Sequence, residues 1–318
     1  MTKFSSGREV MVAGVGLHAF GRFPDKDLAT LALDAVMPAL KDAGVAWKDI
    51  PVAYFGHVYY QGMSVGETAL AKLGLTGIPI INVENACSSG STAFWQAYWG
   101  IANGQFDLAL AFGAEKVPRG PVTVTAEESP DRYIGGDHMM AGYALRMRRY
   151  MEETGAPATA FAQVTVKARQ NAVMNPYAHR KDTYSLEEVL GSRLIADPLT
   201  LFQCCPTSEG AAAAVLCAAD AVGKYGIDKG RCVRIAAAVL RSGNYNGQGS
   251  DHSVFSPYRT EPAALEAYEM SGIGPEEVDL VQVHDAATIG ELQQLEALHL
   301  VPWGEAWQAT LGGRTALS

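Results

Sequence analysis

Residues 80–93 of the chain read Ile80-Ile81-Asn82-Val83-Glu84-Asn85-Ala86-Cys87-Ser88-Ser89-Gly90-Ser91-Thr92-Ala93. The apolar residues at the start of this stretch predict a buried strand, and the small residues after them predict a tight turn into a helix. Cys87 therefore falls between the end of a strand and the first turn of a helix. Unpaired backbone N–H groups and the positive end of the helix dipole favour a thiolate there. Cysteine is more often a small buried apolar residue, but this position predicts that Cys87 is a nucleophile.

The composition excludes several classes of function. Of the 318 residues, 48% are hydrophobic and 19% are charged, which is enough apolar material for a large core, and the formal net charge is −9. An acidic chain without a basic run is not expected to bind nucleic acid or an anionic membrane surface. The N-terminus lacks the apolar core of a signal peptide, and no apolar stretch approaches the roughly 18 residues of a membrane span. We therefore expect a globular cytoplasmic protein.

The 5 cysteines predict neither a disulfide framework nor a zinc site, because their number is odd and no pair has the C-x-x-C spacing. We expect no metal and a reducing compartment. Cys217 and Cys232 lie in apolar stretches and are expected in core strands. The neighbouring Cys204 and Cys205 precede Pro206, and two interpretations remain open for them: ordinary burial, or a loop that lines the site.

Short apolar runs alternate with amphipathic helical patterns, which predicts an α/β fold with helices on both faces of its sheets. The expected strands cover 9–15, 78–83, 106–112, 211–216, 233–240 and 278–284. The expected helices cover 28–43, with a kink or restart at Pro38, then the stretch from Cys87 to about Asn103-Gly104, then 141–153 and 158–172.

The chain is expected to contain two similar halves. We predict an N-terminal half over 1–116, a charged helical excursion over 117–198, a return strand and linker over 199–230, and a C-terminal half over 231–318. A weak internal repeat supports duplication, because a helix, a glycine, a short loop and a strand recur and lead to His57 in one copy and His284 in the other.

His284 is the second candidate catalytic residue. It closes the predicted strand 278–284 and precedes a helix, and open α/β sheets build their sites at the C-terminal ends of strands. A neutral imidazole there can hold a water molecule or donate to an enolate oxygen, with Asp285 as an orienting group. A lone histidine more often only satisfies a loop hydrogen bond, but the analogous position of Cys87 in the other half favours a catalytic role.

Two weaker motifs receive no catalytic role. Residues 14–19 loosely match the dinucleotide fingerprint G-x-G-x-x-A after the first predicted strand. The only acid near the required spacing, Asp34, lies inside a predicted helix, so we expect no nicotinamide cofactor. Glu84 is expected to take part in an ion pair rather than to line the site.

These residues together resemble a known family. Asn85-Ala86-Cys87-Ser88-Ser89-Gly90-Ser91 resembles the nucleophile motif of the thiolases, and His284-Asp285-Ala286-Ala287 resembles the H-D-x-F motif of their sterol-carrier and lipid-transfer branch. The similarity covers essentially the whole chain, including 145–151, 172–178 and 195–199. Residues 208–213 resemble the S-D-G-A-A-A segment of this branch, with glutamate in place of aspartate.

The resemblance implies a thiolase-like fold of two similar α/β halves with mixed sheets and buried helices. It also implies acyl transfer through Cys87, whose thiolate would attack the keto carbon of a 3-oxoacyl-CoA. An acyl-CoA enolate would leave, and a second CoA would remove the acyl group. His284 would serve one oxyanion hole and the backbone N–H of Cys87 another. Coenzyme A is then a substrate, and no bound cofactor is expected.

The sequence also departs from the family pattern. The family's second catalytic histidine, in a G-H-P-x-G loop, would lie beyond Ser318, so we expect the second half to be truncated here. A chain that ended at this point would lack a strand of the second half and would be inactive. The phenylalanine of H-D-x-F is replaced by Ala287 or Thr288, so the shape of the substrate wall differs.

We expect a thiolase that cleaves a branched, steroid or aromatic 3-oxoacyl-CoA. The resemblance implies a homodimer or homotetramer, with a small partner protein that carries an OB-fold and a zinc ribbon. Two alternatives remain open: a condensing synthase or aldolase that acts on acyl-CoA in the same pocket, and a non-catalytic subunit that only binds acyl-CoA. Acylation of Cys87 would separate the thiolase from the binding subunit.

Overall fold

The computed structural model describes residues 7–59, 62–118, 120, 138–242 and 260–317. These residues form two compact units, each described by itself. Unit 1 comprises Met1–Pro118, Tyr177–His179 and Thr207–Leu240, and unit 2 comprises Arg119–Pro176, Arg180–Pro206 and Arg241–Ser318. Each unit is therefore built from segments that are separated in the sequence.

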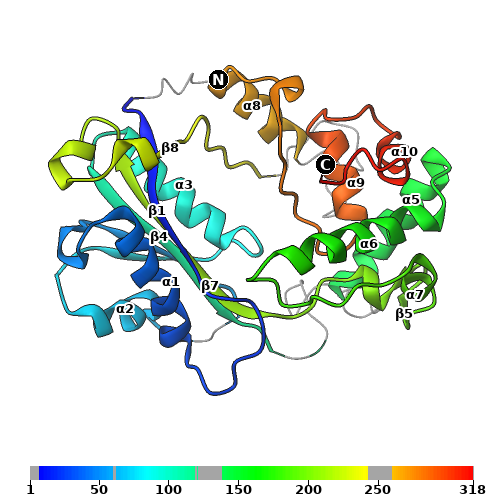
Figure 1. The fold of residues 1–318 in the computed structure, drawn as a ribbon, viewed down its shortest axis with the longest axis horizontal. Coiled ribbons are helices and arrows are strands. Elements are labelled where there is room, and N and C mark those ends of the chain that lie inside the picture. Colours follow the sequence, from blue (N-terminus) through cyan, green and yellow to red (C-terminus); the bar gives the residue numbers. More distant parts are fainter. Residues whose placement is uncertain (1–6, 60–61, 119, 121–137, 243–259, 318) are drawn as a thin grey trace. The chain divides into compact units, whose positions relative to one another are not determined.

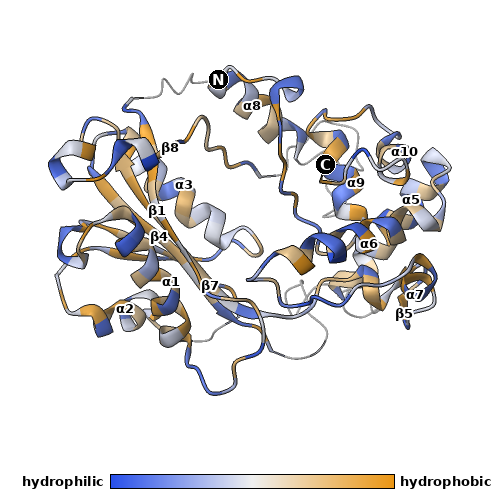
Figure 2. Ribbon diagram, viewed as in Figure 1, coloured by the Kyte–Doolittle hydropathy of each residue, from blue (hydrophilic) through white to orange (hydrophobic). Residues whose placement is uncertain are grey.

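Unit 1 is organised around a six-stranded mixed sheet with the order β3-β2-β4-β7-β1-β8 (Figure 1). Its strands are β1 Val10–Leu17, β2 Ala53–Gly56, β3 Ile80–Val83, β4 Leu108–Lys116, β7 Glu209–Ala218 and β8 Val233–Arg234. Strand β2 is parallel to β3 and β4, whereas β7 is antiparallel to β4 and β1. The central strands β1, β4 and β7 are mostly apolar (Figure 2). The strands predicted over 9–15, 78–83, 106–112 and 211–216 are thus confirmed.

Helices cover both faces of this sheet, with α1 Leu28–Ala43 and α2 Val65–Leu70 on one face and α3 Ser89–Ala102 on the other (Figure 1). Close packing of α1 on β1 requires glycine: a Cβ on Gly16 would lie 2.0 Å from the Ala35 carbonyl oxygen, and one on Gly14 would lie 2.6 Å from that of Ala39. The G-x-G motif at this place therefore serves contact between a strand and a helix.

Helix α1 begins at an N-cap, Asp27, whose carboxylate accepts the Thr30 N–H at 2.6 Å, and it ends at Gly44 in the left-handed conformation (φ 72°). Of the kink or restart predicted at Pro38, the restart is wrong, because the helix continues through this residue. An interior proline costs about 3 kcal/mol. Burial of the apolar face, including Leu31 and Val36 at 0% exposure, offsets this cost.

Unit 2 is mainly helical in its described part. Its helices are α5 Met139–Thr154, α6 Ala158–Met174, α7 Leu186–Leu190, α8 Glu261–Ser271, α9 Ile289–Ala297 and α10 Ala306–Leu311, and its two-stranded sheet pairs β5 Leu194–Ala196 with β6 Leu199–Thr200. The helices predicted over 141–153 and 158–172 are confirmed. The core of unit 2 gathers around α9, and Ile289 and Leu292 pack there with Met147 and Phe161.

Short 3-10 helices connect the main elements at Trp47–Asp49, Ala71–Leu73, Leu201–Gln203, Val222–Tyr225, Lys229–Arg231 and Pro275–Glu277. Within the described ranges, no helix combines the length and the apolar character that crossing a membrane requires.

Two predicted strands differ from the structure. The strand expected over 278–284 is wrong: these residues are outside any sheet, and Leu280 is 66% exposed. An apolar run forms a strand only when a neighbour pairs its backbone groups, and the described part of unit 2 supplies no such neighbour. The strand expected over 233–240 is shortened to β8, which among the described residues pairs with Met11 and Val12 of β1. The pairing stops there because these residues lie near the start of β1.

The structure separates the two cysteines that were expected in core strands. Cys217 is buried in β7, as predicted, and burial raises the pKa of its thiol to about 12. The prediction for Cys232 is wrong, because this residue is only partly buried at the end of the 3-10 helix Lys229–Arg231. Cys232 directly precedes β8, which lies at the edge of the sheet, so among the described residues no further strand covers it on that side.

Candidate functional site

Cys87 lies in unit 1 on the turn between the end of β3 and the start of α3, and it is exposed. The turn is sharp because Ala86 adopts the left-handed conformation with φ 46°, which costs energy for any residue with a Cβ. The local prediction of a strand, a tight turn and a helix is therefore confirmed, and the turn presents the Cys87 side chain to solvent.

Hydrogen bonds connect this turn to the first turn of α3. The Ser89 hydroxyl accepts the Asn85 N–H at 2.8 Å and donates to the Ala86 carbonyl oxygen at 2.7 Å. The Asn85 side-chain amide donates to the Thr92 hydroxyl at 2.9 Å. The residues on both sides of Cys87 are thus fixed to the helix, which restricts where the sulfur can lie.

Glu84 stabilises the same turn. Its carboxylate accepts the Ala86 N–H at 2.8 Å. The predicted ion pair of Glu84 is wrong, since no cationic partner is found among the described residues. A carboxylate beside a backbone N–H in a tight turn gains a charge-assisted hydrogen bond, and this contact takes the place of the ion pair.

The start of α3 lies directly against strand β2. A Cβ on Gly56 would lie 2.6 Å from the carbonyl carbon of Ser89 and 2.7 Å from the nitrogen of Gly90. Only glycine therefore allows this approach of helix to sheet. The next residue, His57, stacks on Phe55 with ring centroids 5.2 Å apart. Gly56 is a residue of the site that sequence reasoning missed.

His284 lies in unit 2 and is exposed. The Gln294 side chain of α9 holds its main chain on both sides, because it accepts the His284 N–H at 2.9 Å and donates to the His284 carbonyl oxygen at 2.6 Å. Gly290 permits this approach of the helix, since a Cβ there would lie 2.7 Å from the same carbonyl oxygen. The Asp285 carboxylate forms no hydrogen bond with the His284 ring in the described part of unit 2, so the predicted orienting role of Asp285 has no structural support.

The vicinal cysteines lie beside the loop that carries His284. The Cys205 N–H donates to the Ala286 carbonyl oxygen at 2.9 Å, and the Thr288 N–H donates to that of Gln203 at 3.1 Å. Cys205 is exposed, whereas Cys204 is partly buried. Burial, together with the neighbouring Cys205 thiol, raises the pKa of Cys204 to about 12. Of the two interpretations for this pair, ordinary burial fits Cys204, which is partly buried. Cys205 is exposed and lies in a loop that contacts the segment carrying His284.

A buried ion pair involves Glu291 in the first turn of α9, the helix that follows His284. Lys167 of α6 contacts the Glu291 carboxylate of α9, with the two side chains 13% and 7% exposed. The Lys167 ammonium also donates to the Thr315 hydroxyl at 3.2 Å. Burial raises the pKa of Glu291, and the nearby Asp285 charge adds to the rise, while Lys167 opposes it. The pair joins α6 to the helix that supports His284.

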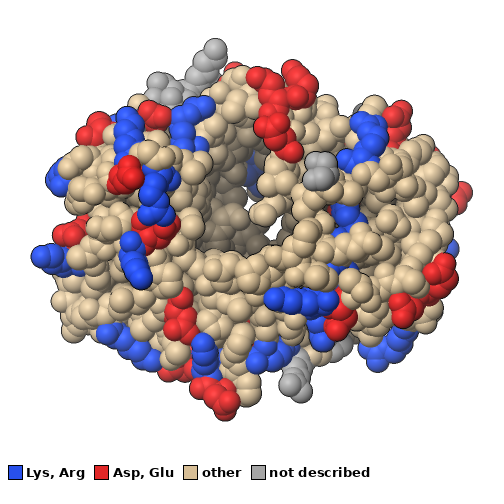
Figure 3. Space-filling model, in the orientation of Figure 1, with Lys and Arg blue, Asp and Glu red and all other residues tan. Residues whose placement is uncertain are grey.

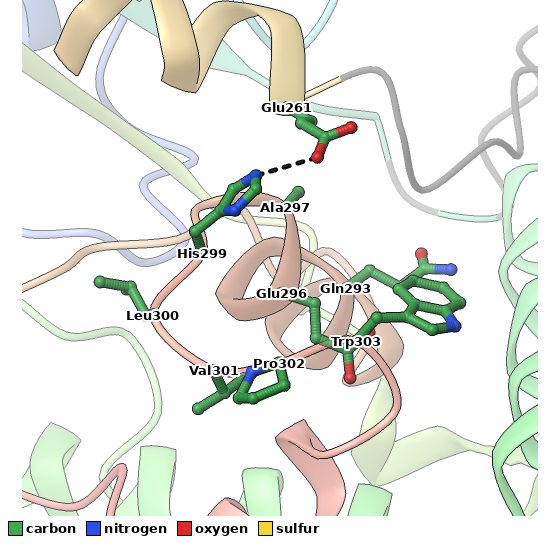
Figure 4. A pocket seen from close by; sticks show the side chains of 9 residues that line it. All are labelled: Glu261, Gln293, Glu296, Ala297, His299, Leu300, Val301, Pro302 and Trp303. Carbon is green, nitrogen blue, oxygen red and sulfur yellow. Dashed lines mark hydrogen bonds and ion pairs between the residues drawn. The ribbon is translucent and has the colours of Figure 1, made fainter. Parts of the chain in front are cut away.

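A pocket of about 300 Å³ opens elsewhere in unit 2 (Figure 4). It is lined by Glu261, Gln293, Glu296, Ala297, His299, Leu300, Val301, Pro302 and Trp303, and it includes neither Cys87 nor His284. Its buried acid, Glu296, accepts the Tyr150 hydroxyl at 2.5 Å and the Ala306 N–H at 3.1 Å. Burial raises the pKa of Glu296. These contacts give Glu296 a structural role that joins α5, α9 and α10.

In the portion of the chain that the structure describes, no group of 3 or more His, Cys, Asp and Glu side chains could hold a metal ion. Cationic and anionic side chains are interspersed on the face in Figure 3. Cys87 belongs to unit 1 and His284 to unit 2.

Comparison with family models gives two matches. Residues 10–220 match the model described as "Thiolase, N-terminal domain". Residues 246–318 match the model described as "Thiolase C-terminal domain-like".

Three curated relatives are similar over most of the chain. "Benzoylsuccinyl-CoA thiolase subunit BbsB" of Thauera aromatica is 42% identical, and the match covers 98% of this chain and 82% of that protein. "Sterol carrier protein 2" of Bos taurus is 36% identical, over 93% of this chain but only 58% of that protein. "Acetyl-CoA acetyltransferase" of Methanocaldococcus jannaschii is 32% identical, over 98% of this chain and 81% of that protein.

Two solved structures share the fold. "Ltp2-ChsH2(DUF35) aldolase" has a TM-score of 0.81 at 23% identity, over 97% of this chain and 81% of that chain. "Crystal structure of human mitochondrial 3-ketoacyl-CoA thiolase in complex with CoA" has a TM-score of 0.67 at 18% identity, over 92% of this chain and 83% of that chain. At these identities the likeness concerns the fold alone.

Proposed function

The chain belongs to the thiolase family, by its matches over residues 10–220 and 246–318, and from this premise we propose that Cys87 carries the acyl group in its reaction. Membership confirms the expected thiolase-like α/β fold with a mixed sheet. The chain is a thiolase-family acyl-CoA acyltransferase, in agreement with relatives at 42% and 32% identity. The residue roles, the acyl group and the partners that follow are proposals.

The Cys87 thiolate attacks the keto carbon of a 3-oxoacyl-CoA. When the resulting tetrahedral adduct collapses, the bond between the α-carbon and the keto carbon breaks, and its electron pair leaves as the enolate of an acyl-CoA. The enolate takes a proton, and the acyl group remains on Cys87 as a thioester. The thiol of a second CoA then attacks this thioester, and Cys87 leaves as the thiolate. The exposed Cys87 on its fixed turn is the observation that carries this proposal.

Two groups stabilise the oxyanions of these steps. The Cys87 N–H, in the turn before α3, serves the oxygen of the tetrahedral adduct. His284 serves the enolate oxygen, either by direct donation or through a water molecule. Such donors act most strongly when they are fixed before the reaction, which agrees with the hydrogen bonds that hold both backbone segments.

The acyl group that we propose is aromatic. A relative that covers most of the chain is named a benzoylsuccinyl-CoA thiolase subunit, and this name points to an aromatic 3-oxoacyl-CoA. The word subunit in that name, and the ChsH2(DUF35) component in the name of a solved structure with the same fold, support a partner protein. We propose a small partner with an OB-fold and a zinc ribbon, bound to a homodimer or homotetramer of this chain. Copurification of only self-associated chain from the native host would contradict the partner.

An aldolase is the second candidate, because the structure with a TM-score of 0.81 is named an aldolase. The two reactions differ in what they require. Thiolysis needs both the Cys87 sulfur and free CoA, whereas retro-aldol cleavage of a hydroxyacyl-CoA needs neither an acyl-enzyme nor a second CoA. The role of Cys87 therefore separates the two functions.

The test compares the wild-type protein, copurified with any partner, with Cys87→Ala and His284→Ala. Each protein is given benzoylsuccinyl-CoA or acetoacetyl-CoA with free CoA, and the products are identified by liquid chromatography and mass spectrometry. The proposal predicts CoA-dependent cleavage by the wild type, none by Cys87→Ala, and a loss of about 10²-fold or more in His284→Ala. Cleavage by Cys87→Ala would contradict the thiolase mechanism.

A further inference from the structure

The main chain of His284 is held by a side chain rather than by a sheet. Residues 278–284 pair with no neighbouring strand in the described part of unit 2, so no ladder of backbone hydrogen bonds fixes the position of residue 284. The Gln294 amide supplies two hydrogen bonds in place of that ladder, one from the His284 N–H at 2.9 Å and one to the His284 carbonyl oxygen at 2.6 Å.

The rest of the loop has separate supports. Backbone pairing joins Ala286 to Cys205 at 2.9 Å and Thr288 to Gln203 at 3.1 Å. On the N-terminal side of His284, the preceding element is the 3-10 helix Pro275–Glu277. Between these supports, Gln294 provides the only hydrogen bonds to the His284 backbone within the described residues. Loss of the Gln294 amide therefore frees residue 284 while it leaves Ala286 and Thr288 in place.

The geometry makes glutamine specific for this task. A primary amide has an acceptor and a donor on one planar group, so it can bind both sides of one peptide segment at once. Gly290 on the same helix brings α9 close to this segment, because a Cβ there would lie 2.7 Å from the His284 carbonyl oxygen. A side chain one methylene shorter would not reach, and a carboxylate would face the carbonyl oxygen without a donor.

We propose that Gln294 is a positioning residue for His284 and sets the placement of its imidazole for catalysis. This inference rests on the proposed role of His284 in stabilising the enolate. Gln294 touches only the His284 backbone in this role, so it acts through His284. A misplacement of about 1 Å in a catalytic group can cost roughly 10²-fold in rate, so a side chain that fixes the backbone of that group has a kinetic effect.

The test uses Gln294→Leu, which has a similar volume and no hydrogen-bonding groups, and Gln294→Asn, which keeps the amide with a shorter reach. Exposed Gln308 on α10 of the same unit offers a matched control, Gln308→Leu. The full protein, with any copurified partner, is assayed with CoA and the better of the two acyl-CoA substrates above. We expect kcat to fall about tenfold or more in both Gln294 variants, with KM changed less than about twofold, and Gln308→Leu to match the wild type.

A double-mutant comparison identifies the residue through which Gln294 acts. If Gln294 positions His284, then His284→Ala with Gln294→Leu is no slower than His284→Ala alone, because the group being positioned is already absent. Amide hydrogen exchange at His284 supplies a readout without substrate: exchange is at least about tenfold faster in Gln294→Leu and unchanged in Gln308→Leu. Unchanged exchange at the other amides shows that the variant is folded elsewhere.

The outcomes separate this inference from the proposed function. A large loss in His284→Ala with wild-type kcat in both Gln294 variants would overturn the inference and leave the function of His284 intact. Additive losses in the double variant would also overturn it, because Gln294 would then act elsewhere. No loss in His284→Ala would remove the proposed function of His284, and the inference with it.

Discussion

Gly56 and Ser89 bring strand β2 and helix α3 into backbone contact, and a Cβ at position 56 would lie 2.6 Å from the carbonyl carbon of Ser89. Since Ser89 also holds the turn around Cys87, this contact determines where the sulfur lies relative to the sheet. Neither the hydrophobic pattern nor the helical periodicity of the sequence predicts this contact between Gly56 and Ser89.

The first prediction concerns this contact. Gly56→Ala forces the start of α3 away from the sheet, so we expect a loss of about 1–3 kcal/mol in the free energy of unfolding and a loss of about tenfold in the rate of Cys87 acylation. Chemical denaturation and acyl-transfer kinetics measure the two effects. Gly90→Ala is the control, because its added Cβ has open space. Equal behaviour of the two variants would show that the contact at Gly56 does not matter.

The second prediction concerns the Ser89 hydroxyl. Ser89→Ala leaves the Asn85 N–H and the Ala86 carbonyl oxygen without the partner they have in the structure. Each of these two partly buried hydrogen bonds contributes about 0.5–1.5 kcal/mol, so we expect urea denaturation to show a loss of about 1–3 kcal/mol in the free energy of unfolding. The exposed neighbour Ser88 makes no side-chain capping hydrogen bond, and Ser88→Ala should change stability by less than about 0.5 kcal/mol.

The third prediction concerns the buried pair of Lys167 and Glu291. Lys167→Met leaves the Glu291 carboxylate without its cation, which should cost about 3–5 kcal/mol. Replacement of both residues, as Lys167→Met with Glu291→Leu, should recover most of this loss, because the desolvation penalty disappears with the charges. A double variant no more stable than Lys167→Met would contradict this explanation.

The same variant should show a defined pH dependence. Burial raises the pKa of Glu291, so the folded protein holds this proton more tightly than the unfolded chain does. The contribution of Glu291 to the free energy of unfolding therefore falls as the pH rises from the ordinary carboxyl pKa through the raised pKa. Removal of Lys167 strengthens the effect, so Lys167→Met should lose more stability at pH 8 than at pH 5, as measured by denaturation at both values.

The fourth prediction concerns Glu209, which replaces the usual aspartate of the family segment. Its carboxylate accepts the Phe23 N–H at 2.7 Å and lies 3.3 Å from both Lys116 and Arg22. Burial alone would raise the pKa of Glu209, but these partners outweigh burial and lower it. Glu209→Gln should therefore cost about 1.5–3 kcal/mol at pH 7.

The pH dependence of Glu209→Gln should have the opposite sign to that of Lys167→Met. A carboxyl with a lowered pKa stabilises the folded state above its ordinary pKa and loses that contribution as the pH falls through the lowered value. The difference in the free energy of unfolding between the wild type and Glu209→Gln should become smaller below about pH 4. A difference that stays constant from pH 7 to pH 3 would contradict an ionic contribution of Glu209.

Local patterns predicted much of unit 1. The apolar runs of β1, β4 and β7 and the stripe of α1 follow from the sequence pattern, because most residues of these strands are buried and the helix is buried on one face. The turn at Cys87 could be read from its small residues. The left-handed conformation of Ala86 and the contact at Gly56 could not be predicted, because they depend on how closely α3 packs against β2 in the folded protein.

The second unit was less predictable. Residues 278–284 have the composition of a strand, but strand formation depends on a neighbour that local sequence does not reveal. The contact from Gln294 to His284 joins residues on different elements, and glutamine in an amphipathic helix usually indicates a solvated face. His284 was predicted as a catalytic residue from its position between a predicted strand and a helix, and the Gln294 side chain that holds its main chain was not predicted.

The central claim is that Cys87 becomes acylated. The most direct measurement is the intact mass of the wild-type protein and of Cys87→Ala after brief exposure to a panel of aromatic, branched and steroid acyl-CoA thioesters. We predict an added acyl mass on the wild type only, localised to Cys87 and removed by free CoA. An adduct that persists in Cys87→Ala, or cleavage of a 3-oxoacyl-CoA without any adduct on Cys87, would contradict the account.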